Sequence, residues 1–187
     1  LPFLLILIPS VVISLYFKND ISSLVFSGER FFSGEIWRLL TFLVTHVDLI
    51  HLLQNIIALI IITLIAYELE LTNTIYILTF FIPAWIIAVF FGFITPLTLI
   101  TGASLGILAL AGYNLIKASN FVIPYISIPL FLLAIAFDKL IYFWDTTNMQ
   151  HMLNMQSILH FTGFLSGIIF FGIVKLLKRK RPPVLSR

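Results

Sequence analysis

The sequence predicts an all-α membrane protein that folds as a single domain of six transmembrane helices. Of its 187 residues, 60% are hydrophobic and only 10% are charged, whereas soluble domains carry about 25% charged residues. The apolar residues are gathered in long runs with few or no charges, and a spanning helix needs about 20 such residues. A block of four basic residues follows the last run, as is typical of the cytoplasmic end of a membrane protein.

The first half of the chain contains three of these runs. The first covers residues 1–17 and ends where a polar, glycine-containing loop begins. The second covers residues 47–67 and ends at the acidic sequence ELEL. The third covers residues 74–93, and the sequence GFITPLTLITG at its end, residues 92–102, contains the Gly and Pro residues that break a helix. Each run is close to the roughly 17 to 25 residues that a crossing requires.

The second half of the chain contains the other three runs. The fourth covers residues 103–117, where Lys117 ends it. The fifth covers residues 121–142 and is followed by the polar sequence DTTNMQHMLNMQ. The sixth covers residues 157–177. We therefore predict a bundle of six helices with no separate soluble domain.

The basic residues orient these helices. Residues 178–187 form a basic tail, which the positive-inside rule places in the cytoplasm. An even number of spans then returns the N-terminus to the same side. Lys117, in the short connection between the fourth and fifth spans, agrees with this orientation. We expect a multi-pass protein of the plasma membrane whose two termini are both cytoplasmic.

The composition also excludes some partners and some chemistry. The chain has no cysteine, so disulfides, thiolate nucleophiles and cysteine-bound metals are excluded. The net charge of +3 at pH 7 is compatible with a nucleic-acid partner. However, the basic block lies directly after the last span, where the positive-inside rule explains it. We therefore expect a protein whose partner is the lipid bilayer and not a nucleic acid.

Polar residues inside the predicted spans lie at similar depths. Asn55, Ser104 and His160 each lie 13 to 15 residues before the charged residue that ends their helix, or roughly 20 to 23 Å at the helical rise of about 1.5 Å per residue. All three helices run from outside to inside in the predicted topology. His51 lies one turn further out, on the same helical face as Asn55. These side chains are expected to meet in one layer, toward the outer face of the membrane.

A serine and a histidine on separate helices at one depth fit nucleophilic acyl transfer. A serine hydroxyl is a weak nucleophile until a nearby base removes its proton, so we expect Ser104 to be the nucleophile and His160 the base. His51, Asn55 and the backbone N–H of Ser104 are the expected donors to the oxyanion. Taken singly, each residue also has a structural explanation, because such side chains bond to their own helix or link neighbouring helices.

A metal site is the main alternative use of the histidines. His46, His51 and His160 could supply imidazole ligands. The sequence HVDLIH, however, lacks the i, i+4 histidine pair and the adjacent glutamate of the zinc metalloprotease motif. We therefore expect no metal and no other cofactor.

The stretches that carry these residues resemble the rhomboid family of intramembrane serine proteases. They are GEIWRLLTFLVTHVDLIHLLQN, GASLG and HFTGFLSG. Rhomboids show Trp-Arg, then His-x4-His-x3-Asn, then Gly-x-Ser-Gly, then His-x2-Gly-x3-Gly, and here the order and the topology are similar over the whole chain. The resemblance implies a six-helix rhomboid-like bundle.

The resemblance also implies a function and its catalytic residues. The family hydrolyses peptide bonds in or near the transmembrane helices of other membrane proteins, without metal or ATP. Ser104 would be the nucleophile and His160 the general base, as a dyad without an acidic third member. The oxyanion would be held by His51, Asn55 and the Ser104 amide.

Other residues receive roles from the resemblance. Trp37 and Arg38 would belong to a first loop that lies partly in the outer leaflet, and His46 would lie near the water-filled cavity. Substrates would enter beside the fifth helix, where Pro124 and Pro129 either weaken the helix or form an ordinary kink. The oligomeric state is left open.

The glycines of these motifs predict close packing. His160, Gly163 and Gly167 share one helical face, so small residues would let the sixth helix approach its neighbour. Gly102 and Gly106 are expected to form a second pair on the fourth helix. Each would lie about 200° around the helix from Ser104, at about 100° per residue, and would therefore face a different neighbour.

Two positions depart from the family pattern. Leu105 stands where a glycine usually follows the serine, and Leu108 stands where an aromatic residue commonly stacks on the dyad histidine. These departures leave open a second hypothesis, a catalytically inactive rhomboid-like protein that binds membrane helices without cutting them. A third hypothesis is a small transporter that uses the polar layer as a solute path.

Overall fold

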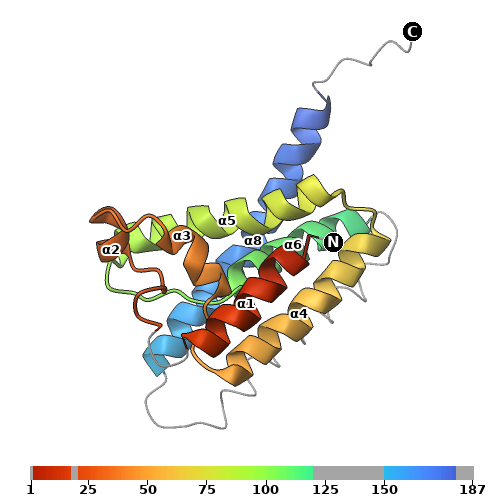
Figure 1. The fold of residues 1–187 in the computed structure, drawn as a ribbon. Coiled ribbons are helices and arrows are strands. Elements are labelled where there is room, and N and C mark those ends of the chain that lie inside the picture. The colour runs from red at the N-terminus through yellow and green to blue at the C-terminus, as the bar shows by residue number, and fades with distance from the viewer. Residues whose placement is uncertain (1, 18–20, 120–149, 180–187) are drawn as a thin grey trace.

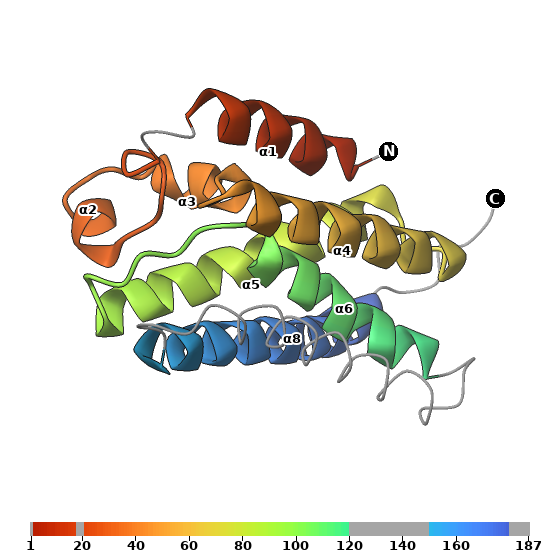
Figure 2. The same cartoon turned by 90° about the horizontal axis from the view of Figure 1, so that it is seen from below.

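A computed structural model describes residues 2–17, 21–119 and 150–179 of the chain. Within these residues the regular structure is helical, apart from an isolated β-bridge between Phe26 and Ile100. Figures 1 and 2 show the arrangement of the helices in two perpendicular views. The helices are α1 (Leu4–Tyr16), α2 (Gly28–Phe32), α3 (Arg38–Thr41), η1 (Phe42–Val44), α4 (Leu49–Glu68), α5 (Asn73–Ile94), α6 (Ser104–Ala118) and α8 (Gln150–Arg179).

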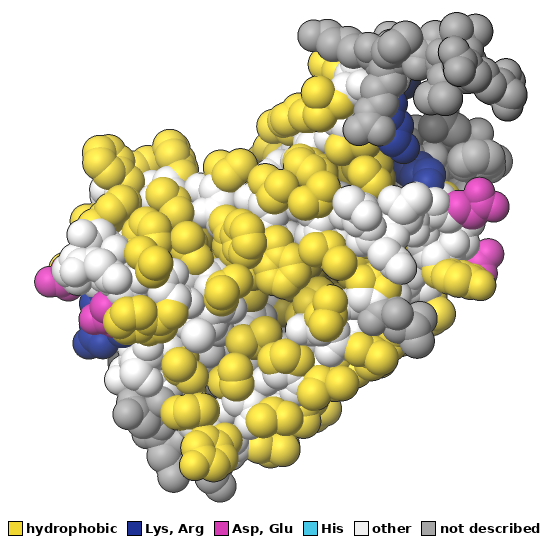
Figure 3. All heavy atoms as spheres, turned by 45° about the horizontal axis from the view of Figure 1, so that its top comes forward, with side chains coloured by type: hydrophobic (Ala, Val, Ile, Leu, Met, Phe, Trp, Pro, Cys, Tyr) yellow, Lys and Arg dark blue, Asp and Glu magenta, His cyan; other side chains and the backbone are white. Residues whose placement is uncertain are grey.

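The helices have the length and the surface of an integral membrane protein. In the described part of the chain, α4, α5 and residues 156–178 of α8 are long and apolar enough to cross a membrane, and α1 and α6 are shorter apolar helices. Figure 3 shows a face on which hydrophobic side chains form a broad band, with charged side chains at its two ends. Such a band suits lipid, because the hydrocarbon core offers no partners to charges.

The count of six spans stays a prediction. The predicted fifth helix, residues 121–142 with Pro124 and Pro129, lies outside the described residues, and so does most of the tail 178–187. The all-helical class and the membrane assignment are confirmed by the helices that the structure describes.

Side-chain caps define where two of the long helices begin. The carboxylate of Asp48 accepts a hydrogen bond of 2.7 Å from the backbone N–H of His51, which satisfies one of the free donors at the start of α4. The Thr72 hydroxyl caps α5 in the same way, through the N–H of Ile75. The cap on α4 therefore fixes the turn that carries His51.

Helix α6 is the centre of the bundle, and it packs against α4, α5 and α8 (Figure 2). It has 15 residues, which is about 22 Å of helix, whereas the hydrocarbon core is about 30 Å thick. If its C-terminal end, with Lys117, lies at one boundary, its first residue lies inside the membrane. That first residue is Ser104.

The backbones of α6 and α8 come into direct contact. A Cβ atom added to Gly167 would lie 1.9 Å from the carbonyl oxygen of Ala109, and one added to Gly112 would lie 2.1 Å from that of Phe164. Real Cβ atoms do not come so close to another atom. Glycine at these two positions therefore permits the spacing that brings the two helices together.

Candidate active site

A serine on α6 and a histidine on α8 lie within hydrogen-bonding distance. The Nε2 atom of His160 is 3.1 Å from the Oγ atom of Ser104. Ser104 is the first residue of α6, so its backbone N–H is among those that the helix itself leaves without a partner. Both residues are partly exposed.

His51 and Asn55 from α4 approach the same region of the chain. Measured from a Cβ atom built on Gly102, two residues before Ser104, the Nε2 atom of His51 is 2.8 Å away and the Nδ2 atom of Asn55 is 3.6 Å away. The amide of Asn55 donates one hydrogen bond, of 2.9 Å, to the carbonyl of His51. An amide group has two N–H donors, so the second one is available for a ligand.

The structure corrects the expectation for Gly102 and Gly106. Gly102 lies before α6 begins and has a φ of +95°, so the two glycines do not form a pair along one helix. A Cβ atom on Gly106 would touch the ring of Phe80 on α5, whereas one on Gly102 would touch the ring of His51. A glycine adopts a positive φ without the steric cost that a side chain brings. The prediction for Gly102 was wrong because it applied the helical period to a residue that lies before the helix begins.

The segment before Ser104 is held by hydrogen bonds to distant parts of the chain. The Thr101 hydroxyl donates to the carbonyl of Thr45 at 2.6 Å, and the N–H of Gly102 donates to the carbonyl of Phe42 at 2.8 Å. Ile100 pairs with Phe26 through two backbone hydrogen bonds. These bonds connect residues more than 50 positions apart, so no local pattern in the sequence indicates them.

The side chain of Leu105 is directed into the protein core. Leu105 is only 2% exposed and belongs to the main hydrophobic cluster. The nearest atoms to a Cβ built on Gly163 are the Leu105 carbonyl oxygen, the Leu105 Cδ2 atom and the Leu108 Cβ atom, at 3.3 to 3.5 Å. Both leucines therefore pack toward α8 at Gly163, one turn after His160.

His46 lies in the turn between η1 and α4, where it contacts two helices. Its Nδ1 atom is 3.3 Å from the Ser14 hydroxyl on α1, and its ring meets the ring of His51 edge to face with centroids 5.1 Å apart. Burial lowers the pKa of His46 to about 4, with a further lowering by His51, against the raising effects of the Val44 backbone and Asp48. His46 is therefore neutral at pH 7.

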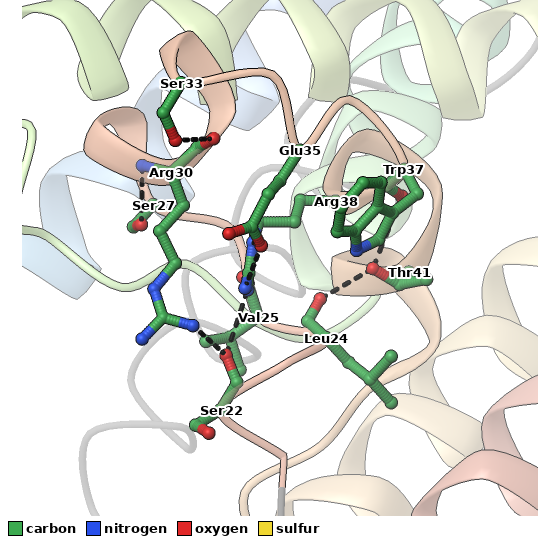
Figure 4. A network of polar contacts seen from close by, with 10 residues as sticks. All are labelled: Ser22, Leu24, Val25, Ser27, Arg30, Ser33, Glu35, Trp37, Arg38 and Thr41. Carbon is green, nitrogen blue, oxygen red and sulfur yellow. Dashed lines mark hydrogen bonds and ion pairs between the residues drawn. The ribbon is translucent and has the colours of Figure 1, made fainter.

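Trp37 and Arg38 hold different positions at the start of α3 (Figure 4). The Trp37 side chain is 50% exposed, whereas Arg38 is 1% exposed. The Arg38 guanidinium forms an ion pair with Glu35 and donates to the carbonyls of Ser22 and Val25. These partners all lie in the segment before α3. Arg38 therefore stabilises that segment and does not contact Ser104.

In the described part of the chain, no three His, Asp or Glu side chains come together as a metal ion would need. The residues that the structure does bring together are a serine, a histidine within reach of it, and a second histidine with an asparagine beside the preceding glycine. Such a set can activate a hydroxyl and donate hydrogen bonds to a developing negative charge.

Comparison with models of protein families gives a match. A family model described as a Rhomboid domain matches residues 33–176, which is most of the chain and includes α3 to α6 and most of α8. No curated protein matches the chain. Helices α1 and α2 lie before the matched range.

Proposed function

Because the chain belongs to the rhomboid family, we propose that it is an intramembrane serine endopeptidase that hydrolyses peptide bonds in or near the transmembrane segments of other membrane proteins. The observation that carries this proposal is the distance of 3.1 Å between Ser104 Oγ and His160 Nε2. Ser166 of α8 bonds to the carbonyl of Gly163 in its own helix. Ser104 instead faces a base that comes from another helix.

In the proposed reaction, His160 Nε2 takes the proton of the Ser104 hydroxyl as Oγ attacks the carbonyl carbon of the scissile peptide bond. The carbonyl oxygen becomes negative in the tetrahedral intermediate. His160 then gives the proton to the leaving amine, the C–N bond breaks, and an acyl group remains on Ser104. Water deprotonated by His160 attacks that ester, which releases the acid and restores the serine.

The donors to the negative oxygen would come from two helices. His51 and Asn55 present Nε2 and Nδ2 beside Gly102, and the N–H of Ser104 lies at the N-terminus of α6, where the helix dipole favours negative charge. Donors fixed before the reaction stabilise the intermediate more than mobile water does. No step in this scheme requires a metal or a cofactor.

The proposed reaction takes place within the membrane, near its outer face. We place both termini in the cytoplasm and the dyad toward the outer face of the plasma membrane, in accord with the basic tail. Trp37 and neighbouring exposed apolar residues such as Ile36 and Leu40 suit contact with lipid. The substrates in this proposal are membrane proteins that reach the dyad from within the bilayer.

The test is labelling of the purified, detergent-solubilised protein with a fluorophosphonate probe. We expect the wild type to be labelled, and Ser104→Ala and His160→Ala to lose labelling while keeping the unfolding midpoint of the wild type. Ser166→Ala is the matched control, because this serine lies on α8 and bonds to the carbonyl of Gly163. Labelling that persists in Ser104→Ala would contradict the proposal.

Leu105 favours one alternative, a rhomboid-like protein that binds membrane helices without cutting them. A folded wild type that labels with no fluorophosphonate probe, but still binds a transmembrane peptide, would support this alternative. Against it stands the burial of the Leu105 side chain at the contact with α8. If that side chain does not block the site, Leu105→Gly should lower stability without raising the labelling rate, because it removes core contacts.

A further inference from the structure

A small cavity lies between α1 and α4, beside the proposed oxyanion residues. Its polar lining consists of Ser10 from α1, His46 from the turn before α4, and Asn55 from α4, and the rest is apolar. The space open to the centre of a water molecule is about 10 Å³, which is close to what a single water needs. The cavity is therefore too small for an organic ligand.

Two buried polar atoms at this cavity have unused hydrogen-bonding capacity. Ser10 is 3% exposed and His46 is 2% exposed. Within the described residues, neither the Ser10 Oγ atom nor the His46 Nε2 atom has a hydrogen-bond partner. The other ring nitrogen of His46, Nδ1, already has the Ser14 hydroxyl at 3.3 Å. An unsatisfied buried polar atom costs about 1 to 3 kcal/mol, and lipid offers no partner in exchange.

We propose that this cavity is a binding site for one internal water molecule, which bridges Ser10 Oγ and His46 Nε2. Water both donates and accepts hydrogen bonds, so it can satisfy the serine hydroxyl together with the ring nitrogen in either tautomer. Buried waters typically have two to four polar partners. Asn55 is a third polar residue in the lining of the cavity. No carboxylate lines the cavity, so the site favours a neutral ligand over a cation.

The water would complete a polar connection from α1 to the oxyanion pair. Ser14 and Ser10 lie one turn apart on α1, and through the water they would hold both ring nitrogens of His46. The His46 ring in turn meets the ring of His51 edge to face. This inference does not depend on proteolysis, because it rests on burial and hydrogen bonding alone.

The first test is the sign of the stability change in Ser10→Ala, measured as the thermal unfolding midpoint in detergent. If water bridges the hydroxyl to His46, the substitution should lower the midpoint by a few degrees. In a dry cavity the same substitution removes an unsatisfied hydroxyl, so the midpoint should rise or stay the same. Ser166→Ala is the matched control and should leave the midpoint unchanged. A rise or no change in Ser10→Ala overturns the proposal.

A double-mutant cycle tests whether the partner of Ser10 is His46 Nε2. The amide of Gln can take the position of Nε2, whereas that of Asn can take the position of Nδ1. Ser10→Ala should therefore still lower the midpoint in a His46→Gln background, and should have little effect in a His46→Asn background. Equal losses in both backgrounds would overturn the bridge.

A high-resolution crystal structure of the wild type gives an independent readout that needs no variant. Density for a water within hydrogen-bonding distance of both atoms supports the proposal, and a site without such density overturns it. All three measurements follow stability or structure. A failure here is therefore distinct from a failure of the proposed proteolysis, which the fluorophosphonate probe reports.

Discussion

The Nε2 atom of His160 lies 3.1 Å from the Oγ atom of Ser104, although 56 residues separate them in the chain. The contact depends on backbone packing between α6 and α8, where Gly112 and Gly167 leave room for the carbonyls of the opposite helix. On the other side of Ser104, bonds from Thr101 and Gly102 fix the start of α6. Predictions about these supporting contacts can be tested separately from the dyad itself.

Gly102→Ala should lose fluorophosphonate labelling and some stability. The new Cβ atom would lie 2.8 Å from the His51 ring, at a backbone φ of +95°. The positive φ alone should cost on the order of 1 kcal/mol, and displacement of His51 should lower the labelling rate by at least about tenfold, within the effect of losing one oxyanion donor. The measurements are the labelling rate and the unfolding midpoint.

Gly34→Ala is the matched control for that experiment. Gly34 has a φ of +112°, but nothing lies within 4 Å of a Cβ atom placed there. This variant should lose only the stability that the positive φ costs, and should label at the rate of the wild type. Equal labelling by both variants would mean that contact with His51 does not matter.

Gly167→Ala should separate α6 from α8. The added Cβ atom would lie 1.9 Å from the Ala109 carbonyl oxygen, so the helices must move apart, and overpacking of this kind typically costs about 1 to 3 kcal/mol. We expect a lower unfolding midpoint together with reduced labelling of Ser104. Gly172→Ala, on the same helix with open space around its Cβ position, should leave both quantities unchanged. A stable, fully labelled Gly167→Ala variant would refute the packing argument.

Arg38→Lys should destabilise the protein although it keeps the positive charge. One ammonium group cannot reproduce the planar guanidinium that bonds Glu35 and the carbonyls of Ser22 and Val25 together. Loss of buried, charge-assisted hydrogen bonds should lower the free energy of unfolding by about 2 kcal/mol. The measurement is the unfolding midpoint in detergent.

Arg30→Lys is the control for Arg38. Arg30 is exposed and donates to the same Ser22 carbonyl at 3.5 Å (Figure 4), so its substitution should change the free energy of unfolding by no more than about 0.5 kcal/mol. If the two variants lose equal stability, the buried network is not what holds this loop.

Stability should fall as the pH is lowered from about 6.5 to 4, in part because of His46. Burial lowers the pKa of this residue from 6.5 to about 4, so the unfolded chain binds a proton more readily than the folded one does. The stabilisation is fully present above pH 6.5 and is lost as the pH falls toward 4. The total effect is on the order of 3 kcal/mol.

The check is a series of unfolding midpoints between pH 7.5 and pH 4.5 for the wild type and His46→Gln. The variant has no titrating group at this position, so its midpoint should depend less steeply on pH. Parallel curves for the two proteins would show that His46 does not contribute to the dependence.

The sequence by itself determined the helical membrane class, the family and the candidate residues. Runs of apolar residues can satisfy their backbone in lipid only as helices or closed barrels, so the class follows from composition and length. The rhomboid family, expected from four short motifs, is confirmed by the family model over residues 33–176. The roles of Ser104, His160, His51 and Asn55 stay predictions that the proposed labelling experiments test.

Only the tertiary structure decided how these residues are supported. It placed Gly102 outside α6 with a positive φ against His51, directed Leu105 into the core, and brought Ser10 and His46 to one small cavity. Each of these facts depends on contacts between helices that are distant in the chain. A helical period gives the face on which a side chain lies, but not the neighbour that the face meets, because that neighbour is chosen by packing of the whole bundle.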